Sequence, residues 1–167
     1  MLGIYVVLND VYTSQRKMPT PRPCVCTSVK KLSRVLGRVY DASLASSPMN
    51  VTQLAVLRCI ERRKGQPLTH VAQELELDRT SLYRALTPML RQGWVTLTPG
   101  ANARSRAAKV TRVGHKALQK AGSRWEEIQL RVVREFGPRK WSVFVADMRR
   151  LATVAARAKE SLQTGIA

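Results

Sequence analysis

The segment DRTSLYRALTPMLRQGWV, residues 78–95, concentrates side chains that can hydrogen-bond to nucleic acid. Its apolar residues recur at helical spacing, which predicts an amphipathic helix that begins at an Asp78 cap and stops at Gly93. The opposite side carries Arg79, Thr80, Ser81, Tyr83, Arg84, Thr87 and Arg91. Short hydroxyls suit phosphates and base edges, and Arg84, one turn into the helix, suits a bidentate contact to guanine. The alternative interpretation is an ordinary solvated helix face.

A second group of basic residues follows directly. Apolar and polar residues alternate in WVTLTP and in AAKVT, which predicts two short strands joined by the polar tip GANARSR. Arg104, Arg106 and Lys109 in this hairpin are predicted to contact phosphates or the minor groove. Their alternative interpretation is a solvated hairpin tip.

The charge balance indicates a polyanionic partner. Twenty-nine Lys and Arg residues against eleven Asp and Glu give a formal net charge of +18 and a pI near 11.1. Such a charge attracts nucleic acid or an anionic membrane surface. A membrane-spanning helix is excluded by the lack of about 20 continuous apolar residues. The apolar start MLGIYVVLNDVY lacks a preceding basic region and is not a signal peptide, and Met18 is an alternative start.

The elements that position these residues follow from periodicity and breakers. Pro88 is predicted to bend the helix within residues 78–95, called the recognition segment below, or to end the first half of that helix. The sequence GPRK, residues 137–140, is predicted to separate two long helices. The predicted helices span about 28–45, 51–63, a short stretch after Thr69, 78–93, about 112–136 and about 141–162.

This order predicts a mainly α chain with a small β-hairpin wing. The two short consecutive helices form a helix-turn-helix, and the hairpin after them is the wing. The outer helices have more apolar positions than a lone winged helix can cover, so we expect a homodimer. The predicted organisation is an N-terminal arm (1–27), a winged helix-turn-helix DNA-binding domain (48–111), and a helical dimerisation region (28–47 and 112–167).

The stretch from VTQLAVLRCIERRKG through the recognition segment to the wing GANARSRAAKVTRVG resembles the multiple-antibiotic-resistance-regulator (MarR) family of bacterial transcription regulators. The resemblance covers roughly residues 28–160. It implies a cytoplasmic repressor that binds a pseudo-palindromic operator as a homodimer and is released by a small aromatic or lipophilic effector. Asn102 stands where the family's wing commonly carries an Asp two residues before an arginine, here Arg104. Asn102 can still accept one hydrogen bond from this arginine, but without charge assistance.

Two further groups carry alternative interpretations. Tyr40, Trp94 and Trp125, with Trp141, are candidates to line an effector pocket, or else are ordinary core aromatics. The C-x-C pair Cys24 and Cys26 is a candidate redox sensor, for which an intersubunit disulfide is more plausible than one within the pair. Cys59 is predicted to be a buried small hydrophobe.

Other functional classes are disfavoured. Two isolated histidines and scattered acids offer neither a nucleophile with its base nor a metal site, so we predict no enzyme, no metal and no cofactor. Three cysteines do not form a secreted disulfide framework, which indicates a reducing cytoplasm. A non-specific architectural DNA-binding protein needs the same charge but not the hydroxyl-rich recognition helix.

Overall fold

A computed structural model of the chain describes residues 23–100 and 105–165. The chain divides into two compact units, residues 1–36 and 37–167, and α2 begins in the first and ends in the second. The described part is mainly helical with one antiparallel hairpin, so the predicted fold class is confirmed. No helix of the described residues is long and apolar enough to cross a membrane. In chain order the elements are α2 (Val25–Ser43), α3 (Val51–Arg62), α4 (Leu68–Glu74), α5 (Arg79–Arg91), β1 (Val95–Pro99), β2 (Arg106–Val110), α6 (Arg112–Phe136) and α7 (Pro138–Thr164).

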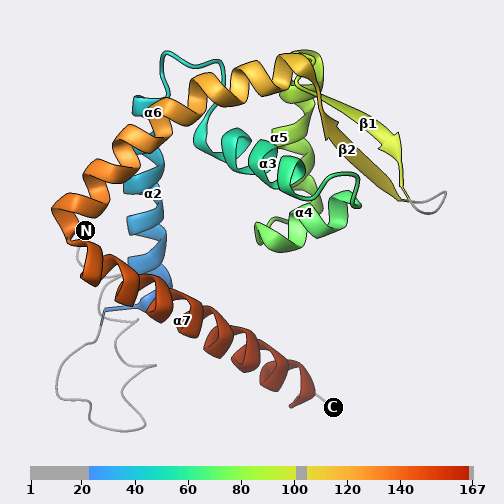
Figure 1. Cartoon of the computed structure of the whole chain (residues 1–167). Coiled ribbons are helices and arrows are strands. Elements are labelled where there is room, and N and C mark those ends of the chain that lie inside the picture. The colour runs from blue at the N-terminus through green and yellow to red at the C-terminus, as the bar shows by residue number, and fades with distance from the viewer. Residues whose placement is uncertain (1–22, 101–104, 166–167) are drawn as a thin grey trace, which may run out of the picture. The chain divides into compact units, whose positions relative to one another are not determined.

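The core lies among α3, α4, α5, the hairpin and the first half of α6 (Figure 1), with Leu44 and Met49 from the segment before α3. α3 starts at a capping box, in which the Asn50 side chain accepts from the Gln53 backbone N–H and the Gln53 side chain accepts from the Asn50 N–H. α5 contributes Leu82, Leu86 and Met89, each at most 2% exposed. The burial of these apolar side chains determines which face of α5 is exposed to solvent.

The recognition segment ends in a glycine cap. Gly93 has φ +67°, its N–H donates to the Leu90 carbonyl, and the Trp94 N–H donates to the Met89 carbonyl. This is the Schellman pattern, which satisfies the last carbonyls of a helix. The idea that Pro88 ends the first half of the helix is wrong, because α5 continues through Pro88 to Arg91. Buried Met89 and the cap stabilise the last turn even though proline supplies no donor there.

The hairpin is built in register with Leu97 opposite Ala108. β2 also forms an isolated bridge from Ala107 to Pro67, the residue before α4. The helix-turn-helix and the wing are therefore joined by backbone pairing as well as by apolar contact.

Thr111 connects the hairpin to α6. Its N–H donates to the Trp94 carbonyl, and its hydroxyl donates to the Gly93 carbonyl at 2.6 Å and caps α6 by accepting from the Gly114 N–H. Gly114 lies so close to Trp94 that an added Cβ would meet the Trp94 carbonyl oxygen at 2.1 Å. A glycine is required there by space rather than by backbone angle.

The boundary between α6 and α7 differs from the prediction. Only Gly137, with φ +99°, breaks the helix, and Pro138 to Lys140 already form the first turn of α7. Proline is accepted at the first helical position because its missing N–H would have no partner there. At the other end of the chain, α2 begins at Val25 rather than at 28, so the predicted arm overlaps this helix.

Candidate nucleic-acid interface

Asp78 fixes the first turn of α5. Its carboxylate accepts from the Ser81 backbone N–H and from the Ser81 hydroxyl, both at 2.8 Å. These bonds lower the pKa of Asp78, so the cap stays charged. The Ser81 hydroxyl proton is thus used inside the helix, and the half-buried Ser81 can offer a nucleic acid only an acceptor.

The donors on the exposed face of α5 belong to fewer residues than the sequence indicated. The Thr87 hydroxyl also donates within the helix, to the Tyr83 carbonyl at 2.8 Å. Thr80, Arg84 and Arg91 are exposed. On α5, the hydroxyls of Thr80 and Tyr83 and the guanidinium groups of the arginines can therefore donate to phosphates or base edges.

Arg79 and Tyr83 form a pair at the start of this face. The Arg79 guanidinium carbon lies 5.7 Å from the centre of the Tyr83 ring, within the range of a cation–π contact. Both residues border an open hollow of about 400 Å³ that Thr80, Arg84 and Thr87 complete. The polar face of α5 therefore contains a shallow hollow that is lined by residues of this helix.

A second hollow, of about 470 Å³, joins this face to the wing. Its polar lining comes from α4, α5 and the start of β2, and includes Thr69, Gln73, Arg79, Tyr83, Ser105 and Arg106. Arg106 is exposed, and because it lines this hollow together with Arg79 and Tyr83 it lies beside α5. The fold brings these predicted arginines of α5 and the wing to one surface.

Of the remaining residues predicted to act in the wing, the structure describes Lys109 alone. Lys109 is exposed on β2. Arg104 and Asn102 lie outside the described residues. All these contacts with DNA stay predictions.

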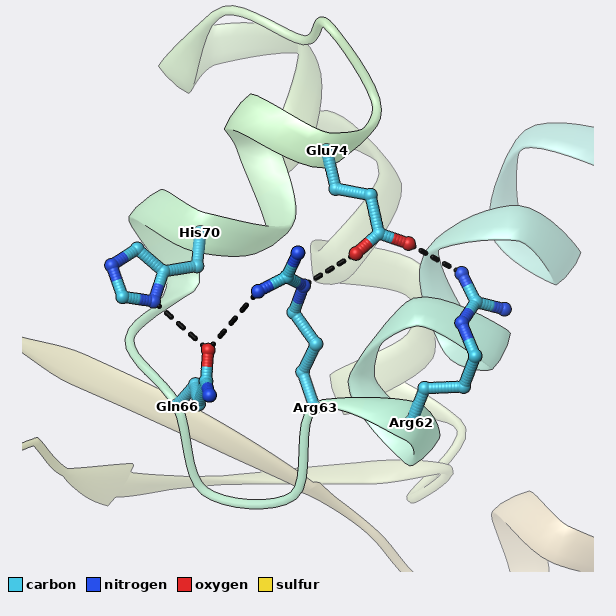
Figure 2. Close-up of polar contacts among 5 residues, drawn as sticks. All are labelled: Arg62, Arg63, Gln66, His70 and Glu74. Carbon is cyan, nitrogen blue, oxygen red and sulfur yellow. Dashed lines mark hydrogen bonds and ion pairs between the residues drawn. The ribbon is translucent and has the colours of Figure 1, made fainter.

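A polar network that the sequence did not reveal holds α4 against α3. Figure 2 shows the Glu74 carboxylate between the guanidinium groups of Arg62 and Arg63, with Gln66 between Arg63 and His70. Arg62 first and Arg63 second lower the pKa of Glu74 to about 2, so the bridge is intact above pH 4.5 and is lost only as the pH falls toward 2. These two arginines therefore join α3 to α4. Glu74 lies 12 residues after Arg62 and 11 after Arg63. The pairing therefore becomes visible only when α4 is packed against α3.

His115 links α6 to α3 through both ring nitrogens. Nε2 lies 3.1 Å from Glu61 Oε2, and Nδ1 lies 2.8 Å from the Thr111 carbonyl. Because both partners are acceptors, the full set of bonds requires the doubly protonated ring. The Thr111 carbonyl first and Glu61 second raise the pKa of His115, against the opposing charge of Lys64.

We expect this contact to make stability depend on pH. A raised folded-state pKa contributes stability that is complete below the unfolded value of 6.5 and is lost as the pH rises through the folded value. Urea unfolding between about pH 6 and about pH 8 should show a decline for the native chain that is reduced in His115→Gln. His70→Gln is the matched control and should retain the decline. Equal pH profiles for the native chain and His115→Gln would contradict the assignment.

The aromatic residues predicted to form an effector pocket line neither of the two hollows described above. Trp94 is 4% exposed and belongs to the core. Trp125 lies under the Arg58 guanidinium, at 4.0 Å, and the Tyr40 hydroxyl donates to Gln129 one turn further along α6. Tyr40 and Trp125 thus border neighbouring turns of α6, whereas Trp141 packs against Phe144.

The three cysteines are free, and their positions differ. Cys24 and Cys26 are exposed at the start of α2, and Cys59 is buried, as predicted. Hydrogen bonds from the Thr27 side chain and backbone lower the pKa of Cys24. Within the described residues no group of three His, Cys, Asp or Glu side chains could hold a metal ion.

Comparison with known proteins gives this surface a context. Residues 53–99 match the IclR helix-turn-helix domain model, a stretch that runs from α3 to the end of β1. No curated protein matches the sequence. The M. tuberculosis transcriptional regulator MosR, solved in complex with DNA, is 31% identical, with 80% of this chain and 98% of MosR covered and a TM-score of 0.69.

The chain belongs to the family of MosR. Two more distant structures share its fold: the Streptomyces coelicolor regulator PcaV with its natural ligand (18% identity, 81% and 99% covered, TM-score 0.67), and the S. aureus MepR–DNA complex (14% identity, 78% and 95% covered, TM-score 0.66). MosR, PcaV and MepR are MarR-family regulators. The likeness to the MarR family is thus confirmed in structure, while the matching sequence model, which omits β2 and the long helices, is of the IclR type.

This relative of MosR is a DNA-binding transcriptional regulator with a winged helix-turn-helix. The solved structures that it resembles are described as transcriptional regulators.

Proposed function

We propose that the chain is a MarR-family repressor that binds a pseudo-palindromic operator as a homodimer. The observation that carries the proposal is the polar face of α5, which stays exposed beside the wing while its apolar face fills the core. A recognition helix presents its outer face in this way to the major groove. Arg84 then reads a base, while Arg91, Arg106 and Lys109 bind phosphates.

Unburied apolar surface on α7 supports the homodimer. All residues from 146 to 162 are exposed, including Met148 and Leu151 at 39% each and Leu162 at 70%. Most of the stability of a helix in a protein comes from the packing of its apolar face, so a partner surface that covers these residues would stabilise α7. α2 carries a similar exposed stripe of Val25, Val29, Leu32, Val35 and Val39. A second copy with the same helices supplies a matching surface.

Sedimentation and DNA binding test the proposal together. The native chain should sediment as a dimer at micromolar concentration and bind a selected palindromic duplex more tightly than a scrambled one across a salt titration. Leu151→Glu should sediment as a monomer and lose this binding. Thr153→Glu adds the same charge on another side of α7 and should remain dimeric. A folded native monomer would contradict the dimer, and equal affinity for both duplexes would favour an architectural protein.

Two signals are candidates for release from DNA. One is a small effector, which the MarR resemblance implies to be aromatic or lipophilic; PcaV, which shares the fold, was solved with its natural ligand. Oxidation is supported by the exposed Cys24 and Cys26 and by the lowered pKa of Cys24, because the thiolate is the reactive form. Hydrogen peroxide should release a chain that senses oxidation but spare Cys24→Ser/Cys26→Ser. A chain released only by an aromatic ligand should show no difference between these two proteins.

A further inference from the structure

The orientation of Thr87 limits what this residue can offer to DNA. Its hydroxyl donates to the carbonyl of Tyr83, one turn earlier in the same helix, at 2.8 Å. The residue is nevertheless exposed, and it borders the open hollow on the polar face of α5. With the hydroxyl proton donated to the backbone, the γ-methyl and the acceptor lone pairs of the oxygen are left for an outside contact.

We propose that the methyl group of Thr87 reads a thymine through the C5-methyl group of that base. This inference rests on the proposed entry of α5 into the major groove. Among the bases only thymine presents a methyl group there, and a threonine methyl makes the apolar contact that it accepts. Thr87 is then a specificity-determining residue of a different kind from Arg84, because it discriminates by apolar contact rather than by donating hydrogen bonds.

The spacing along α5 places this thymine. Thr87 follows Arg84 by three residues, a rise of about 4.5 Å along the helix, compared with about 3.4 Å between base pairs. Both residues line the same hollow. The thymine therefore lies within about two base pairs of the guanine that Arg84 contacts.

Two substitutions separate the methyl from the hydroxyl. Thr87→Val keeps the shape and the methyl but removes the hydroxyl, whereas Thr87→Ser keeps the hydroxyl and its bond to the Tyr83 carbonyl but removes the methyl. Valine, serine and threonine have similar helix propensities, so an exposed position should tolerate both changes without loss of folding. Circular dichroism of the two variants checks this.

The experiment begins with binding-site selection on the native chain. Each thymine of the selected site is then replaced by deoxyuridine, which lacks only the C5-methyl group. We expect one thymine per half-site at which this change weakens native binding about fourfold, the value of one buried methyl group. Thr87→Val should keep the same sensitivity. Thr87→Ser should bind the thymine and deoxyuridine duplexes with equal affinity. That affinity should match the affinity of the native chain for the deoxyuridine duplex.

The outcomes distinguish the two levels of the proposal. Selection that yields no preferred sequence overturns the proposed function. A preferred sequence at which Thr87→Ser keeps the full deoxyuridine sensitivity, or at which Thr87→Val loses it, overturns the role of the methyl alone. If Thr87→Val instead loses affinity that depends on the amino group of an adenine, the oxygen of Thr87 is an acceptor and the assignment to thymine is wrong.

Discussion

Gly114→Ala is expected to lower the free energy of unfolding by about 2 kcal/mol or more. The new Cβ would lie 2.1 Å from the Trp94 carbonyl oxygen and 2.9 Å from a methyl of Val110. The neighbour is backbone at the base of the hairpin, so relief requires α6 to move away from Trp94. Overpacking of this kind costs about 3 kcal/mol, and the better helix propensity of alanine returns only about 1 kcal/mol.

Gly122→Ala is the matched control in the same helix. The nearest atom to its added Cβ is Nη2 of Arg58 at 3.6 Å, an ordinary contact at the end of a flexible side chain. This variant should be as stable as the native chain or more stable by up to about 1 kcal/mol. Urea unfolding followed by circular dichroism measures both. If Gly114→Ala unfolded at the native midpoint, the close approach of α6 to Trp94 would be disproved.

Arg84→Ala is expected to lose sequence discrimination more than total affinity, by roughly 1–3 kcal/mol at one base position. Arg84 is exposed one turn into α5, beside Thr80 and Tyr83, where a recognition helix lies deepest in the groove. Its guanidinium matches the two acceptors of guanine. Binding-site selection on the native chain and the variant should show one position of the consensus relaxed in each half-site.

Arg91→Ala is the control for charge alone. Arg91 lies in the last turn of α5, so its loss should weaken binding to all sequences and reduce the salt dependence by about one phosphate contact. The same uniform loss from Arg84→Ala would make Arg84 a phosphate contact. A consensus unchanged by Arg84→Ala would show that another residue reads the base.

Local rules predicted the parts of the fold that local chemistry determines. The Asp78 cap, the Gly93 stop and the two strands of the hairpin each depend on residues a few positions apart, and each is confirmed. Pro138 was misread because the same residue can end one helix or begin the next, and Gly137 supplies the break in this chain.

The candidate site was predicted in its location but not in its detail. The apolar positions of α5 define its outer face, so the sequence was sufficient to place Thr80, Arg84 and Arg91 there. It was not sufficient to show that the hydroxyls of Ser81 and Thr87 donate within the helix, because that depends on side-chain rotation. The bridge from Glu74 to two arginines required the packing of α4 on α3.

The joint at Thr111 has a mechanical consequence. One side chain and its N–H bind the end of α5, the base of the hairpin and the start of α6, so these three pieces must turn together. Arg79 lies at the far end of α5, about 20 Å from this joint. A tilt on the order of 10° there would carry the tip of the helix about 3.5 Å, which is the spacing of one base pair. If α5 enters the major groove as proposed, a rotation of this size transmitted from α6 would therefore shift the helix tip by about one base pair.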